Sequence, residues 1–231
     1  ALRGVRRVRH VKALLNQRAM HKERNAAGVL TLMKDPIALM SARWLVQEFG
    51  LRCVVMIRHP GAFVASINRL EWNSRPFRWA LSQPELMAEV FPMYRAELEL
   101  MRDQDYEVID HASMAWKLHH HVIASLQGEF ADSPNWHFVY HEELSADPEA
   151  GFSALYDKLG LTFTAEAKAS IAEHSSAENP DQAEGKDKAL RLNSAANLKA
   201  WHSALSAADI ATVKNRVAGV VERFYPEDSW G

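Results

Sequence analysis

The sequence predicts an α/β fold in which helices flank a central parallel sheet. Two short apolar runs, residues 29–33 and 52–57, each lead within a few residues into a stretch with helical periodicity. A third apolar run covers residues 135–140 and also precedes a helix. Strands that alternate with helices over short connections are typical of parallel sheets covered by helices. We therefore expect the carboxyl ends of these strands to share one edge of the sheet.

The composition limits the class of protein. With 231 residues, 48% of them hydrophobic, the chain can bury one core, and we expect a single domain over residues 1–231. A net charge of −2 gives no overall basic field for nucleic acid. The single cysteine, Cys53, excludes an intramolecular disulfide and suits a reducing, cytoplasmic location. No apolar run is long enough for a membrane span. The oligomeric state is left open.

The first predicted element is a basic helix over residues 2–24, which Gly28 ends. Its cations are typical of a solvated helix face, and the alternative is a rim that attracts an anionic ligand. They are Arg3, Arg6, Arg7, Arg9, Lys12 and Arg18. The strand over 29–33 then leads to Lys34 at its carboxyl end, and Gly50 ends the following helix, residues 37–49.

The segment 52–70 carries the most informative pattern. The apolar run ends at Ile57, Arg58 follows it, and Pro60 suits the first position of a helix. Gly61 lets a ligand approach the backbone closely. Ligands of open α/β sheets bind at the carboxyl ends of strands, where a helix N-terminus and a guanidinium both attract phosphate. The pattern indicates a phosphate site, and the alternative is a surface ion pair beside an ordinary turn.

The rest of the chain is predicted to be mainly helical. Asp147 and Pro148 combine an N-cap with a first-turn proline, and Ser206 with Asp209 resembles a capping box. The helices are expected over residues 84–103, 112–129, 148–159 and from 206 to Pro226, with a long loop over 174–197.

Three consecutive histidines, His119 to His121, suggest a metal cluster at first sight. They fall within the helix predicted over 112–129, where consecutive side chains point to different faces. No spacing typical of zinc ligands occurs elsewhere. The sequence therefore predicts no metal site.

In order and spacing, these motifs resemble the sulfotransferases that use 3′-phosphoadenosine 5′-phosphosulfate (PAPS). Arg58 followed by Ser66 resembles the family's 3′-phosphate motif, and Lys34-Asp35-Pro36 resembles its lysine motif. The resemblance covers residues 29–225 and implies the family's P-loop-NTPase-like fold. Three later matches are Tyr140-His141-Glu142-Glu143-Leu144 before Asp147-Pro148, Leu159-Gly160-Leu161, and Trp201 before Leu205-Ser206.

The resemblance implies a role for each matched residue. Arg58 and Ser66 would bind the 3′-phosphate, and Tyr140 would position the adenine. Lys34 would neutralise charge on the bridging oxygen as the sulfonate leaves. The alternatives are a strand-end core tyrosine and a surface lysine. Three residues of the long loop would close over the 3′-phosphate, unless that loop is only solvated: Arg191, Asn193 and Ser194.

The catalytic base, which would take the proton from the acceptor substrate, is less well defined. Asp35 is adjacent to the lysine and is a candidate catalytic base, with helix capping as the alternative. His10 and His59 are further candidates, and the cation of Arg58 should make His59 harder to protonate. Four residues are candidates for an apolar acceptor wall, with ordinary core packing as the alternative: Trp72, Phe77, Trp79 and Met87.

The chain departs from the family at one point. No glycine-rich loop that would cradle the 5′-phosphosulfate precedes Lys34. We expect such a loop upstream of Ala1, which makes residues 1–231 alone catalytically incomplete.

The predicted function is transfer of a sulfonate from PAPS to a hydroxyl or amine of a small-molecule or carbohydrate acceptor. The product would be 3′,5′-adenosine diphosphate, and no metal is expected. The alternative is a non-catalytic protein that binds 3′-phosphoadenylate.

Overall fold

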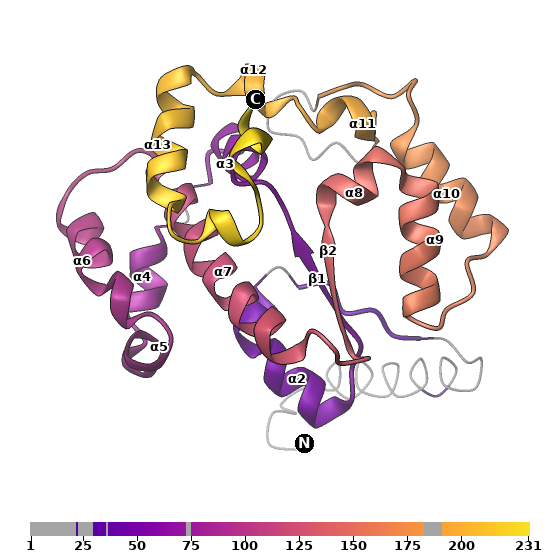
Figure 1. The fold of residues 1–231 in the computed structure, drawn as a ribbon, viewed down its shortest axis with the longest axis horizontal. Helices are drawn as coiled ribbons and strands as arrows, with labels where there is room; N and C mark the ends of the chain where they lie inside the picture. Colours follow the sequence, from indigo (N-terminus) through magenta and orange to yellow (C-terminus); the bar gives the residue numbers. More distant parts are fainter. Residues whose placement is uncertain (1–21, 23–29, 36, 73–74, 183–190) are drawn as a thin grey trace, which may run out of the picture. The chain divides into compact units, whose positions relative to one another are not determined.

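The computed structural model describes residues 22, 30–35, 37–72, 75–182 and 191–231 (Figure 1). The chain divides into two compact units, residues 1–38 and 39–231. A single domain over the whole chain stays a prediction. Apart from Lys22, the basic helix predicted over 2–24, its cations and His10 lie outside the described residues.

In the first unit, the strand predicted over residues 29–33 is wrong for its described part. Residues 30–35 have no regular secondary structure, and the side chains of Leu30 and Leu32 are 72% and 90% exposed. An extended segment is stable only where a neighbouring strand or a packed face supports it, and neither is present for these described residues.

The second unit contains the parallel strand pair. Strand β1 (Cys53–Ile57) pairs in parallel with β2 (Trp136–Tyr140), and Ile57 lies opposite Tyr140. Both strands form where the apolar runs predict them. Among the described residues the sheet has two strands, so the α/β prediction holds in a coarse form, with a small parallel sheet in a mainly helical chain.

The two faces of the sheet contribute to different cores. Val55, Ile57 and Trp136 alternate into the main core, whereas Val139 belongs to a smaller core with α8 and α9. Helix α7 packs against α3 and α13 in the main core. The helices named here are α3 (Pro60–Arg69), α7 (Val108–Phe130), α8 (His141–Ala146), α9 (Pro148–Lys158) and α13 (Ala207–Val217).

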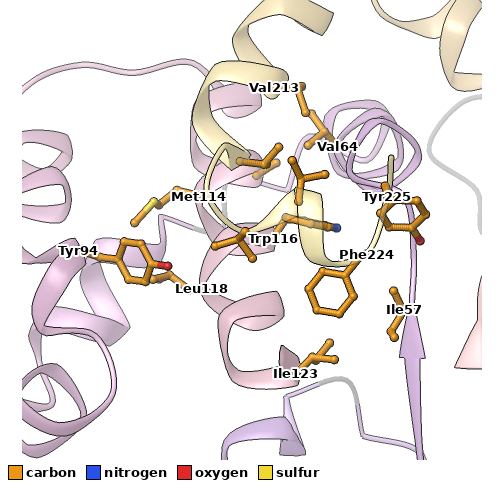
Figure 2. Close-up of a cluster of buried hydrophobic side chains, with 14 of the residues drawn as sticks. Ile57, Val64, Tyr94, Met114, Trp116, Leu118, Ile123, Val213, Phe224 and Tyr225 are labelled. Atoms are coloured by element: carbon orange, nitrogen blue, oxygen red, sulfur yellow. The ribbon is translucent and has the colours of Figure 1, made fainter. Parts of the chain in front are cut away.

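Trp116 of α7 lies at the centre of the main core. Its side chain is fully buried, and its indole stacks on His120 with ring centroids 3.7 Å apart. Figure 2 shows the indole among side chains of α3, β1 and the C-terminal segment, with its nitrogen directed away from the rest of α7. Buried aromatic rings contribute a large apolar area, so this residue joins three parts of the chain.

Local end signals account for the elements that match the predictions. The 3₁₀ helix Ala38–Ser41 continues as α2 (Ala42–Phe49), and Gly50 ends it in the left-handed conformation at φ 61°. The Asp147 side chain accepts the Ala150 N–H at the start of α9. Ser206 and Asp209 form the predicted capping box at the start of α13.

Three predicted boundaries are wrong. The helix expected over 84–103 is interrupted near Pro92, because proline removes a backbone N–H and clashes with the preceding turn. The last helix ends at Val217, ahead of Gly219 with φ 81°, and not at Pro226. Helix α7 begins at Val108, before residue 112. The interrupted region forms α5 (Pro84–Glu89), a 3₁₀ helix (Pro92–Tyr94) and α6 (Arg95–Asp103).

The loop predicted over 174–197 is shorter, because helices occupy both of its ends. Helix α10 (Ala165–Ser175) starts at the Thr164 cap and continues past residue 174. Helix α11 (Ser194–Asn197) starts at the Asn193 cap. Short helices that depend on packing were not predicted, namely α4 (Pro76–Leu81), α8, α12 (Trp201–Ala204) and the 3₁₀ helices Val221–Arg223 and Glu227–Trp230.

No helix in the described ranges combines the length and the apolarity that crossing a membrane requires.

Gly61 fills a place where a side chain does not fit, because an added Cβ would lie 2.6 Å from the Trp201 ring. Gly61→Ala should therefore lower the unfolding free energy by about 1–3 kcal/mol. Gly128→Ala is the matched control: it lies within α7 with nothing within 4 Å of the added Cβ, and should stabilise by about 0.5–1 kcal/mol. Urea unfolding of the two variants measures both effects. Equal shifts in the same direction would contradict the steric interpretation.

Candidate functional site

The candidate site lies where β1 and β2 end. Arg58 and His59 follow β1, and Tyr140 ends β2 directly before His141 and Glu142 of α8. The parallel register brings these two chain segments together, and the His59 backbone N–H donates to Glu142 Oε1 at 2.8 Å. The edge predicted from the sequence as a ligand site is thus formed by both strands.

The peptide group between Arg58 and His59 is held on both sides. Its N–H donates to Glu142, and its carbonyl oxygen, that of Arg58, accepts from Trp116 Nε1 at 2.8 Å. A strand that ends leaves its last peptide without a ladder partner, and buried peptide groups need such partners. Side chains from α7 and α8 supply them here and fix the backbone that carries the Arg58 side chain.

The Arg58 side chain is half-buried, and its Nε is buried without a hydrogen-bond partner among the described residues. Burial lowers the pKa of this guanidinium, whereas the nearby charge of Glu142 raises it. An arginine side chain stays charged in proteins, so its buried N–H group calls for an acceptor. Phosphate oxygens meet this need in a bidentate geometry.

Glu142 is engaged through both carboxylate oxygens. Oε1 accepts from the His59 backbone, and Oε2 accepts from the Tyr225 hydroxyl at 2.9 Å. Burial and the charge of Glu142 both raise the pKa of Tyr225, so the phenol stays protonated and donates. The C-terminal segment is thereby joined to the strand ends.

His59 is a buried structural residue at this edge. Its Nδ1 accepts the Gly61 N–H at 3.1 Å, so Nε2 carries the proton that faces Ser229 Oγ at 3.4 Å. The ring stacks on Trp201 with centroids 4.8 Å apart and lies edge-on to Tyr225 and Trp230. With both nitrogens engaged and the ring enclosed, His59 does not suit the part of an acceptor base.

The expected difficulty in protonating His59 is confirmed, but for another reason. Burial is the main cause that lowers its pKa to about 4, and electrostatic interactions with His202 and Lys214 lower it further. The cation of Arg58, which the sequence suggests as the cause, is not among the groups that lower this pKa. The expectation that Gly61 makes room for a ligand is wrong, since the Trp201 ring fills that space.

Tyr140 lies at the same edge, and Ser66 lies on the helix that follows Arg58. Tyr140 is half-buried at the end of β2 and packs edge-on against Tyr225, with ring centroids 5.7 Å apart. Ser66 is half-buried on α3, the helix that begins two residues after Arg58. The structure thus unites Arg58 and Tyr140 at the strand ends and sets Ser66 on the adjoining helix.

The three residues predicted to close over a phosphate have different local contacts. Arg191 pairs with Glu173 of α10 at 2.6 Å, and both side chains are exposed. The Asn193 amide caps α11 and also donates to Asp181 at 2.9 Å. Ser194 opens α11, which packs against α8 directly after β2.

The predicted catalytic pair lies in the first unit. Lys34 and Asp35 are exposed, and Asp35 Oδ1 accepts the Ile37 N–H at 2.9 Å. This contact is the capping alternative named for Asp35. That Lys34 lies beside Arg58 stays a prediction.

The three histidines of α7 point to different surroundings, as the helical spacing predicts. His119 stacks on Trp79, His120 on Trp116, and Nδ1 of His121 lies 3.1 Å from the Tyr94 hydroxyl. In the part of the chain that is described, no three side chains of His, Cys, Asp or Glu are grouped to hold a metal ion.

The apolar wall residues are mostly core. Met87 is fully buried, and Phe77 and Trp79 pack against the main core. Trp72 is 53% exposed. The core alternative therefore describes three of these four side chains.

Sequence reasoning missed Glu142, Tyr225 and Trp116 as parts of the site. Glu142 belongs to the quoted strand-end motif, and an acidic residue just past a strand was a usable signal. Tyr225 and Trp116 carry no local signal, because each reaches the edge only through tertiary packing.

Comparisons with known protein families, with curated proteins and with solved structures find no match.

The buried neutral His59 makes stability depend on pH. Its folded pKa of about 4 lies below the ordinary value of 6.5, so between these values the unfolded state binds more protons. The contribution of His59 to the unfolding free energy should therefore be fully present above about pH 7 and fall by about 2–3 kcal/mol toward pH 4.5. Denaturant titrations of the wild type and His59→Asn, which keeps a cap for Gly61, should show a shallower profile for the variant. Parallel profiles would contradict the assignment.

Proposed function

We propose that this chain binds PAPS at the strand ends and transfers its sulfonate to a hydroxyl or amine of an acceptor, in a P-loop-NTPase-like sulfotransferase fold. PAPS supplies the activated sulfonate, and 3′,5′-adenosine diphosphate is the product. The proposal rests on the order of the sequence motifs together with the geometry of the strand ends.

The observation that carries the proposal is the Arg58 guanidinium. It lies at the carboxyl edge of a parallel strand pair, its Nε is buried without a partner in the described chain, and its backbone is held from both sides. Leaving a charged donor unpaired is costly, and an anion with several acceptor oxygens removes that cost. A 3′-phosphate is such an anion.

The neighbouring residues fit the rest of a nucleotide. The Tyr140 ring ends the adjacent strand and suits stacking on or edge contact with a purine. Ser66 on α3 supplies a hydroxyl donor, and Ser194 supplies another at the start of α11, which packs against α8. The first N–H groups of α3 contribute less, because His59 already caps Gly61 and Pro60 has no N–H.

A second candidate is a non-catalytic protein that binds 3′-phosphoadenylate. It is favoured by one observation: residues 30–35 are exposed and irregular, and Asp35 serves as a turn cap beside Lys34. In this case the strand-end site would act alone, without the sulfonate chemistry.

Binding of the nucleotide should depend on Arg58. Losing charge-assisted bonds to the phosphate should cost roughly 1.5–3 kcal/mol of binding free energy. Arg58→Ala should therefore lower the affinity for 3′,5′-adenosine diphosphate by about 10- to 150-fold. The wild type should bind adenosine 5′-monophosphate, which lacks the 3′-phosphate, about as weakly as the variant binds the diphosphate. Isothermal titration calorimetry measures both.

Arg52→Ala is the matched control, since Arg52 is exposed at the amino end of the same strand, and it should leave both affinities unchanged. Equal affinity of the wild type for the two nucleotides would refute the phosphate site.

Lys34 decides between the two candidates. If it stabilises the leaving oxygen, Lys34→Ala in the complete protein should lower kcat at least 100-fold and change nucleotide affinity less than threefold. Transfer of labelled sulfonate to phenol, alcohol, amine and sugar acceptors is the assay, with the exposed Lys199→Ala as control. Unchanged kcat with a raised KM would show that Lys34 only binds. Selective nucleotide binding by the complete protein without transfer to any acceptor would favour the non-catalytic protein.

A further inference from the structure

Glu142 lies at the strand ends but has no role in the proposed function. Its charge acts on Arg58, yet among the described residues no ion pair joins the two side chains, and Arg58 Nε has no hydrogen-bond partner. A buried guanidinium next to a free carboxylate would normally form a bidentate pair. Instead, the two oxygens of Glu142 accept from the His59 N–H and from the Tyr225 hydroxyl.

We infer that Glu142 is a positioning residue for the phosphate site: it fixes the Arg58–His59 peptide and, held by Tyr225, leaves the Arg58 guanidinium free for the ligand. This inference rests on the proposed function. It adds that selectivity for the 3′-phosphate is set by a residue that does not itself contact the nucleotide.

The first part of the inference is geometric. Glu142 Oε1 and Trp116 Nε1 each lie 2.8 Å from opposite ends of one peptide group. That peptide directly follows the Cα of Arg58, so its orientation sets the direction in which the side chain leaves the backbone. Positioning of this kind matters because small displacements of a binding group cost large factors in affinity or rate.

The second part concerns the Tyr225 hydroxyl. It donates to Glu142 Oε2 at 2.9 Å, and its ring packs against both His59 and Tyr140. The ring contacts hold the hydroxyl in place. Without that hydroxyl, Oε2 would be an unpaired acceptor close to Arg58, and the carboxylate would compete with a phosphate for the same donors.

Three variants separate charge from geometry. Glu142→Gln keeps the shape, because its amide oxygen can accept from His59 while its NH₂ donates to the Tyr225 oxygen. Glu142→Ala removes both contacts. Tyr225→Phe keeps the ring packing and removes only the donor. The quantity compared is the ratio of affinities for 3′,5′-adenosine diphosphate and adenosine 5′-monophosphate, measured by calorimetry on the full chain.

We expect Glu142→Gln to keep this ratio within threefold of the wild type. Glu142→Ala and Tyr225→Phe should each lower it at least tenfold while the affinity for adenosine 5′-monophosphate stays the same. A merely structural role would lower the melting temperature and weaken both nucleotides in parallel, or change neither. Either pattern would overturn the inference. If Glu142→Ala does not fold, Tyr225→Phe decides alone, and an unchanged ratio in that variant rejects the inference.

The inference and the proposed function fail in different ways. A wild type that does not distinguish the two nucleotides defeats the proposed function, and the inference with it. The inference alone fails if the wild type distinguishes the two nucleotides and Arg58→Ala loses this selectivity, whereas Glu142→Ala and Tyr225→Phe keep it.

Discussion

The peptide group that links Arg58 to His59 accepts one hydrogen bond and donates another, and these two bonds connect β1 to α7 and to α8. The peptide lies where β1 leaves the sheet, and its carbonyl and N–H would otherwise be buried without partners. Trp116 of α7 satisfies one and Glu142 of α8 the other. Because α7 covers one face of the sheet and α8 belongs to the small core on the other, this peptide ties both layers to the strand ends.

The aromatic residues around His59 pack at the same strand ends. Trp201 and Trp230 enclose the imidazole, and Tyr225 contacts both His59 and Glu142. A neutral histidine is what such surroundings favour, because a cation would lose its hydration there. The apolar enclosure and the polar contacts therefore require each other: the rings exclude water, and the few buried polar atoms find partners within the chain. Among the described residues of this edge, Arg58 Nε is the buried polar atom without a partner.

Local patterns predicted the local parts of this arrangement. The apolar run before Arg58 predicted β1, and Pro60 marked the first residue of α3. Ser206 and Asp209 predicted the capping box at the start of α13. The errors arise where distant contacts decide. Leu30 and Leu32 look like a strand but have no partner, and Gly61 suggested room for a ligand where a tryptophan from the C-terminal part of the chain packs. Glu142 and Tyr225 could not be paired from sequence, since nothing local relates them.

The contact between Ser229 and His59 has a consequence for how the protein reaches its folded state. These residues are separated by 170 positions, and Glu142 and Tyr225 by 83. Closing such long segments costs chain entropy before any contact repays it, so topologies of this kind fold slowly. During synthesis, β1 and α3 leave the ribosome well before the residues that enclose their junction. Until Trp201, Ser229 and Trp230 are made, His59 and the start of α3 stay open to water and to other proteins.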